Sequence, residues 1–209
     1  FAEYNQAIWP MQVVLVFTAL AAVFLVLKPN SLSNRVITLL LACLWLWMGI
    51  AYHLAFFTRI NQAAYAFAAL FIAQAALFLL AGIVKKALTF RVRWNAVGIV
   101  GGLFIVYSLL IYPAVGFFSG HRYPYSPTFG APCPTTIFTF GLLLWADRKV
   151  PRYALWIPLL WSLIGMFAAI SLGMLEDVGL PVAGIMGTTL ILLRNGRMES
   201  QSRADARYA

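Results

Sequence analysis

Residues 60–118 read INQAAYAFAALFIAQAALFLLAGIV (60–84), KKALTFRVR (85–93) and WNAVGIVGGLFIVYSLLIYPAVGFF (94–118). The first and third segments are longer than the roughly 20 apolar residues that a helix needs to cross a bilayer. The short segment between them carries four basic residues. Because basic loops are retained on the cytoplasmic side of a membrane, this pattern predicts two transmembrane helices joined on that side.

The rest of the chain follows the same pattern. Of its 209 residues, 63% are hydrophobic and 10% are charged, whereas soluble domains are about half apolar and about a quarter charged. We predict an all-α, polytopic membrane protein in which residues 1–195 form a single domain of seven transmembrane helices. A polar cytoplasmic tail, residues 196–209, is predicted to be disordered. The predicted spans are Ile8–Leu27, Val36–Phe57, Ile60–Val84, Trp94–Phe118, Pro134–Trp145, Tyr153–Leu172 and Val178–Leu193.

The basic residues orient the predicted bundle. All 15 except Arg59 and Arg122 fall in the connections after the first, third and fifth spans or in the tail. By the positive-inside rule, the N-terminus is predicted to lie outside and the C-terminus in the cytoplasm. This sorting accounts for the net charge of +9, so nucleic acid is not an expected partner. The first span has no basic segment before it and no cleavage site after it, so we expect it to be retained.

The expected partners follow from this membrane character. The lipid bilayer surrounds the predicted bundle. Gly98 and Gly102 lie four residues apart on the fourth span and allow close helix packing. That packing either stays within the bundle or joins two copies of the chain in a homo-oligomer.

Unusual residues gather on the predicted outer side. The longest outer connection, residues 119–134, contains four prolines. Because proline restricts the backbone, this loop is expected to form a rigid cap over the outer ends of the helices. The residues expected to belong to the cap or to a pocket beneath it are Tyr4, Asn5, Asn61, Arg122, Tyr123 and Tyr125.

Five outer side chains are of the types that bind Zn²⁺ or copper ions. Cys133 precedes Pro134, which places its thiol near a helix N-terminus, where the helix dipole favours thiolate. The competing interpretation is a polar rim that meets only water and lipid headgroups, because no CxxC, HxxxH or HExxH spacing is present. The candidate metal ligands are His53, His121, Cys133, Glu176 and Asp177.

Reaction chemistry is not apparent in the sequence. The spans contain no carboxylate or basic side chain near their middle, which argues against ion-coupled pumping. No Walker A sequence, dinucleotide fingerprint or GxSxG elbow occurs. The sequence favours binding, or permease-like passage, of a small ligand or metal ion at the outer side. Two alternatives are a non-catalytic subunit of a larger membrane complex that docks through the outer loop, and a metal-dependent membrane enzyme.

Several short motifs carry a resemblance to a known family. They are Tyr4-Asn5, Trp9-Pro10, Tyr52-His53, Ile60-Asn61, the segment Gly120-His121-Arg122-Tyr123-Pro124, and the segment Phe129-Gly130-Ala131-Pro132-Cys133-Pro134-Thr135-Thr136. With these motifs the whole chain resembles the bacterial multi-pass membrane proteins of domain of unknown function 6064. The resemblance implies a bacterial inner membrane location and supplies no activity or catalytic residue.

Overall fold

The computed structural model describes residues 1–208 and confirms the all-α prediction. Helix accounts for 77% of the structure, and no strand occurs within the described range. In chain order the helical segments are α1 (Ala2–Ala7), α2 (Met11–Val26), α3 (Ser31–Trp47), η1 (Met48–Phe56), η2 (Phe57–Arg59), α4 (Ala64–Leu79), η3 (Leu80–Val84), α5 (Ala96–Val106), η4 (Tyr107–Ile111), α6 (Tyr112–Phe118), α7 (Pro132–Leu144), α8 (Tyr153–Leu172), η5 (Leu175–Val178) and α9 (Gly179–Tyr208).

Several consecutive helical segments join into long, continuous apolar helices. Five of them are long and apolar enough to cross a membrane: Ser31–Arg59, Ala64–Val84, Ala96–Phe118, Tyr153–Ser171 and Leu175–Ala206. Two shorter apolar helices, α2 and α7, complete the set. Large apolar side chains lie on the outside of these helices, including Phe17, Phe118 and Ile170, which are 64%, 86% and 73% exposed. So much exposed apolar surface is typical of a membrane protein. The count of seven spans stays a prediction.

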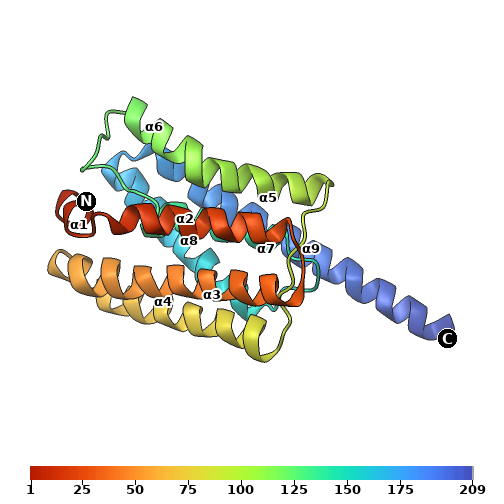
Figure 1. Cartoon of the computed structure of the whole chain (residues 1–209). Coiled ribbons are helices and arrows are strands. Elements are labelled where there is room, and N and C mark those ends of the chain that lie inside the picture. Colours follow the sequence, from red (N-terminus) through yellow and green to blue (C-terminus); the bar gives the residue numbers. More distant parts are fainter. Residues whose placement is uncertain (209) are drawn as a thin grey trace.

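The connections alternate between the two ends of the bundle. Figure 1 shows the N-terminus, the α3–α4 turn and α6 at one end, which we call the N-terminal end. The α2–α3 and α4–α5 connections and the C-terminus lie at the opposite end, which we call the C-terminal end (Figure 1). The basic segment 85–93 therefore lies at the C-terminal end, and the proline-rich loop lies at the N-terminal end.

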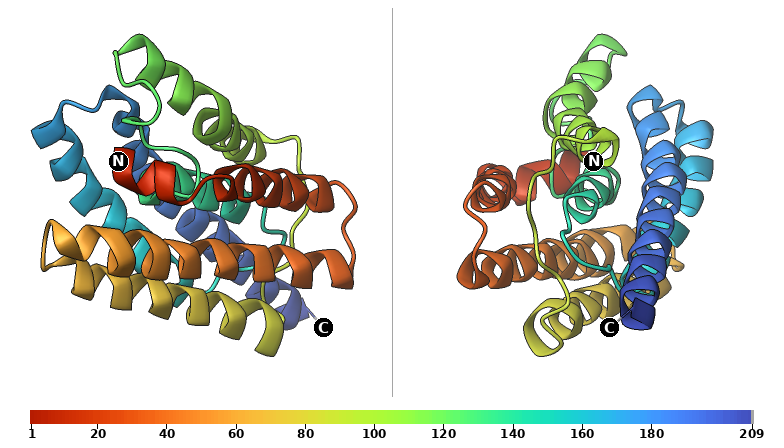
Figure 2. Two further views of the ribbon diagram at one scale, coloured as in Figure 1. Left: turned by 60° about the vertical axis from the view of Figure 1, so that its left-hand side comes forward. Right: turned by 90° about the vertical axis from the view of Figure 1, so that its right-hand side faces the viewer.

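Helix α7 occupies the centre of the bundle (Figure 2). Its 13 residues make it roughly 20 Å long, which is shorter than the roughly 30 Å hydrocarbon core of a bilayer. All of its residues except Cys133 are buried, because α5, α8 and α9 pack around it. The short helix is thus surrounded by protein and need not reach either membrane surface by itself.

The close approach of α5 and α7 depends on a glycine that the sequence analysis did not select. A Cβ atom on Gly101 would lie 2.9 Å from the carbonyl oxygen of Gly141 on α7. The predicted packing pair behaves differently: a Cβ on Gly102 would meet only Trp145 at an ordinary 3.5 Å, and Gly98 accepts a hydrogen bond from Trp145 at its carbonyl. The face of α5 that contacts α7 most closely is therefore centred on Gly101 and not on the predicted Gly102.

The structure differs from the predicted disordered tail. Helix α9 continues through this segment to Tyr208 and projects beyond the bundle (Figure 1). Glu199 accepts a hydrogen bond from Arg203 one turn later, at 2.9 Å, and lies 3.7 Å from Lys149. Such pairs support a helix, and no proline or glycine follows Gly196 to end it. Residue 209 of the predicted tail lies outside the described residues.

Candidate functional site

Asn5 attaches the proline-rich loop to the N-terminal helix. Its side chain is fully buried. The amide nitrogen Nδ2 donates to the carbonyl oxygens of Pro124, at 2.6 Å, and Ser126, at 2.7 Å. The amide oxygen Oδ1 accepts from Thr128 Oγ1 and from Gln12 Nε2, both at 3.0 Å. One side chain thus holds three positions of the loop over the N-terminal end of the bundle.

The other predicted loop and pocket residues divide into two groups. The hydroxyl of Tyr123 points back toward the bundle and donates to the carbonyl of Asn5 at 3.4 Å, although the residue is 53% exposed. Arg122, Tyr125 and Asn61 point elsewhere. Arg122 lies over the ring of Phe117, Tyr125 is 72% exposed, and Asn61 accepts a hydrogen bond from the amide of Ala63 just before α4.

Tyr4 belongs to the inward group. Its hydroxyl accepts a hydrogen bond from Trp47 Nε1 at 3.0 Å, and its ring lies edge-on to Tyr52 and Phe56. Burial raises the pKa of Tyr4 to about 12, although the hydrogen bond from Trp47 opposes the shift. The hydroxyl therefore stays neutral at physiological pH.

Two buried carboxylates lie beneath the loop. Glu176 is fully buried, and its Oε1 lies 2.9 Å from Nδ1 of His121. Asp177 is 4% exposed, and its Oδ1 accepts a hydrogen bond from the hydroxyl of Tyr112 at 2.5 Å. Gly116 provides space for this arrangement, because a Cβ there would lie 3.2 Å from Glu176 Oε1.

The backbone around these carboxylates is also held in place. The hydroxyl of Tyr107 donates to the carbonyl of Glu176 at 2.8 Å, and the amide of Asp177 donates to the carbonyl of Met174 at 3.1 Å. The two carboxylates therefore sit on a turn, η5, that is fixed against α6 and η4 before any ligand arrives.

Asp177 lines a cavity of about 330 Å³ between α1, η1, α8 and η5. Cys133, at the start of α7, lines the same cavity and is a neighbour of the Asp177 carboxylate. The remaining wall is mainly aromatic and includes Tyr4, Tyr52, Phe56, Phe57 and Trp161. The cavity thus combines one buried carboxylate and one thiol with several aromatic rings.

His53 does not join the carboxylates. Its imidazole is fully buried among aromatic rings, with centroid distances of 4.7 Å to Phe71, 5.3 Å to Trp161 and 5.7 Å to Phe67. Neither of its ring nitrogens has a hydrogen-bond partner among the residues that the structure describes. Because Trp161 also lines the cavity, His53 supports the cavity wall from behind.

The structure gives no support to a metal centre made of the five predicted ligands. Within residues 1–208, no group of three or more His, Cys, Asp or Glu side chains could hold a metal ion. The predicted ligands instead form the pair His121 and Glu176 and the pair Cys133 and Asp177, and His53 faces a different set of neighbours. The ligand set was inferred from a shared membrane side, which does not decide the direction in which each side chain points.

Comparison with known proteins places the chain in a family. Residues 1–202 match the model of a family of unknown function, DUF6064. The chain belongs to this family. No curated protein and no solved structure matched the chain significantly. The match covers the proline-rich loop, the carboxylate turn and every residue of the cavity described above, so the whole site lies within the DUF6064 region.

Several residues at the candidate site of this DUF6064 protein did not stand out in its sequence. Tyr112 and Trp161 lie within long apolar segments. In such a segment, the sequence does not distinguish an aromatic residue that faces lipid from one that faces the interior of the bundle. A usable signal was available for Gln12, because a polar amide in the first span needs an internal partner. That partner is Asn5, through which Gln12 contributes to the attachment of the loop.

Proposed function

We propose that the protein is a seven-helix membrane protein with its N-terminus outside and its C-terminus in the cytoplasm. The proposed location is a bacterial inner membrane, with the cavity facing the periplasm. The distribution of basic residues supports this orientation, since the connections at the C-terminal end carry nearly all of them. In this arrangement the cavity receives a small ligand from the outer side. The proline-rich loop adjoins it through its contacts with Asn5 and Glu176, although residues 119–131 do not line it as the sequence predicted.

The proposed ligand is a small organic cation that carries apolar groups on its nitrogen. The observation that carries this assignment is the Asp177 carboxylate, which opens into a cavity with aromatic walls. Aromatic faces attract cations, and cages of such rings are the usual receptor for quaternary ammonium groups. A buried carboxylate adds charge complementarity, whereas a wall of rings alone would accept a neutral apolar molecule equally well.

Further details of the cavity agree with a polar organic ligand better than with a bare metal ion. Trp161 is 9% exposed, and its indole Nε1 has no hydrogen-bond partner within the described part of the chain. This nitrogen is close to Gly165, which also lines the cavity: a Cβ atom on Gly165 would lie 3.8 Å from Trp161 Nε1. A ligand with both an ammonium group and a hydroxyl or carbonyl oxygen would pair with Asp177 and with this indole together.

Choline and its neutral isostere 3,3-dimethylbutan-1-ol test this proposal, because they share their shape and differ in one charge. We expect purified protein to bind choline about tenfold more tightly or better, as one favourable charge interaction predicts. Saturation-transfer NMR on the protein in detergent measures both affinities.

The variant Asp177→Asn should remove the preference for choline. Glu3→Gln provides the matched control, since Glu3 is an exposed carboxylate of the same end of the bundle that pairs with Arg59. Equal affinity of the wild type for the two compounds, or equal losses in the two variants, would contradict the proposal.

A further inference from the structure

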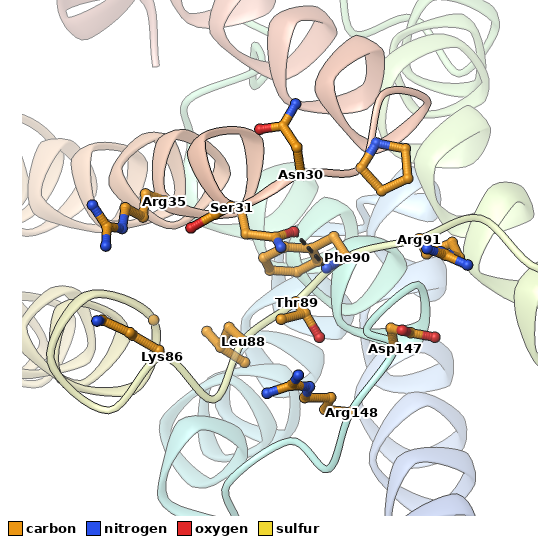
Figure 3. Close-up of a pocket in the computed structure, with 13 residues that line it drawn as sticks. Asn30, Ser31, Arg35, Lys86, Leu88, Thr89, Phe90, Arg91, Asp147 and Arg148 are labelled. Atoms are coloured by element: carbon orange, nitrogen blue, oxygen red, sulfur yellow. Dashed lines mark hydrogen bonds between the residues drawn. The ribbon is translucent and has the colours of Figure 1, made fainter.

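A second pocket lies at the opposite, C-terminal end of the bundle. It has a volume of about 360 Å³ and lies between the start of α3, the segment after η3 and the segment after α7 (Figure 3). Four of its lining residues are basic, and the view in Figure 3 shows the charged ends of Arg35 and Lys86 on one side of the pocket. The basic lining residues are Arg35, Lys86, Arg91 and Arg148.

Little negative charge balances these four residues. None of them takes part in an ion pair within the part of the chain that the structure describes. The single acidic residue of the lining, Asp147, accepts a hydrogen bond from Arg93, which lies outside the pocket lining. The pocket therefore has an unbalanced positive charge, which favours an anionic occupant.

The backbone that carries the basic side chains is fixed. The amide of Phe90 donates to Asn34 Oδ1 at 2.8 Å, which attaches the segment after η3 to α3. The amide of Asp147 donates to the carbonyl of Thr89 at 2.7 Å, and the amide of Arg91 donates to the carbonyl of Trp145 at 2.8 Å. Because these bonds join three segments, the backbone that lines the pocket and carries the basic residues is preformed.

Neutral hydrogen-bond donors face the same space. Helix α3 begins at the pocket, with Asn30 as its N-cap and Ser31 in its first turn. Asn30 Oδ1 accepts a hydrogen bond from the amide of Ser33 at 2.8 Å, whereas the amide of Ser31, like other first amides of a helix, has no partner inside the helix and favours an anion. The hydroxyl of Thr89, which also lines the pocket, is buried and has no partner among residues 1–208.

The backbone of Lys86 has an unusual conformation. Its φ angle is +50°, the left-handed region in which glycine normally ends a helix. The next amide, of Ala87, donates to the carbonyl of Ala81 at 2.8 Å and completes the end of the helix. A residue with a Cβ is disfavoured here, whereas glycine adopts this conformation at no steric cost. Lysine at this position therefore lowers the stability of the protein somewhat, and it places a positive charge at the pocket.

We propose that this pocket binds a phosphate group, supplied either by the headgroup of an anionic membrane lipid or by a phosphate-bearing solute. Basic pockets between membrane helices bind lipid phosphates through the same chemistry. Cationic side chains, helix amides and a free hydroxyl together provide the donors that phosphate oxygens require. The site lies at the end of the bundle opposite the aromatic cavity and does not depend on the ligand proposed there.

Two phosphate probes and a matched pair of double variants test this proposal. The first probe is phosphatidylglycerol, with zwitterionic phosphatidylcholine as its reference, measured by native mass spectrometry of the detergent-solubilised protein. The second is inorganic phosphate, measured by line broadening in phosphorus NMR. The pocket variant is Lys86→Gly with Arg148→Gln. The control, Arg152→Gln with Arg203→Gln, removes the same charge from exposed residues that do not line the pocket.

We expect the pocket variant to bind the responding probe about tenfold more weakly or worse, because two charge contacts are lost, and the control to change less than about twofold. Preference for phosphatidylglycerol identifies a lipid headgroup, and binding of inorganic phosphate alone identifies a solute. Lys86→Gly by itself should raise the midpoint of thermal unfolding, so weaker binding cannot be attributed to misfolding. Equal losses in both double variants, or no binding of either probe beyond phosphatidylcholine, would overturn the proposal.

Discussion

Replacement of Asn5 by alanine is expected to release the proline-rich loop from the bundle. The substitution removes two donors to the carbonyls of Pro124 and Ser126 and one acceptor for Thr128. Because buried polar groups that lose their partners each cost about 1–3 kcal/mol, we expect the free energy of unfolding to fall by about 3 kcal/mol or more. Tyr4, the neighbour of Asn5 on α1, lines the cavity, so choline affinity should fall as well.

Hydrogen exchange of the backbone amides in residues 119–131 measures this release, together with the midpoint of thermal unfolding. Asn61→Ala is the matched control, because Asn61 is exposed and its Oδ1 accepts only from the amide of Ala63. Fast exchange in the loop of Asn5→Ala, with unchanged exchange in Asn61→Ala, is the expected result. If the loop of Asn5→Ala stays as protected as in the wild type, Asn5 does not hold it.

Truncation of Trp161 to alanine is expected to have the largest effect on the cavity. The indole packs against the rings of His53, Phe67 and Phe71, at centroid distances of 5.0 to 5.4 Å, and forms one wall of the cavity. Removal of a buried tryptophan of this kind costs about 3–5 kcal/mol of folding free energy. It also removes the widest aromatic face, so choline binding should become undetectable.

Trp156→Ala is the matched control, since Trp156 lies on the same helix and is 53% exposed. It should retain both stability and binding. Trp161→Phe separates binding from folding, because phenylalanine keeps an aromatic face and loses the indole Nε1. That variant should fold, with choline affinity reduced but measurable by saturation-transfer NMR. Choline affinity equal to that of the wild type in Trp161→Ala would remove the aromatic wall from the proposed site.

Hydropathy located the helices well. The predicted sixth span, Tyr153–Leu172, coincides with α8, and the predicted fifth span, Pro134–Trp145, lies within two residues of α7. The thickness of the bilayer sets the length of each apolar segment, so these segments can be located in a sequence before the fold is known. The helical tail could not be predicted in the same way, because its polar composition suits both a solvated helix and a disordered segment.

The direction of each side chain was harder to predict. In a soluble helix the polar face identifies the apolar one, whereas most faces of these helices are apolar and give no such signal. The sequence could therefore place His53 near the outer end of its span but not show that it faces Phe71 and Trp161. Likewise, Gly101 and Gly98 are both small, and only the packed structure reveals which of them meets the α7 backbone.

Short polar segments gave better information about the site. Glu176 and Asp177 stand beside each other in a connection where little else is charged, which marked them as candidates. Their actual partners, His121 and Tyr112, could not be paired with them from spacing, because they lie more than 50 residues away in the chain. The proposed site is therefore not the predicted set of five metal ligands but a mainly aromatic cavity with one carboxylate.

Reactivity of Cys133 toward a cationic thiol reagent tests the central claim most directly, because this thiol lines the cavity. In a Cys43→Ala background, membrane-impermeant methanethiosulfonate ethyltrimethylammonium is added to the outside of intact cells. We predict that Cys133 is modified from the outside, and that choline slows the reaction while 3,3-dimethylbutan-1-ol does not. Modification only after the membrane is opened, or at a rate that choline leaves unchanged, would contradict an outward-facing cavity for organic cations.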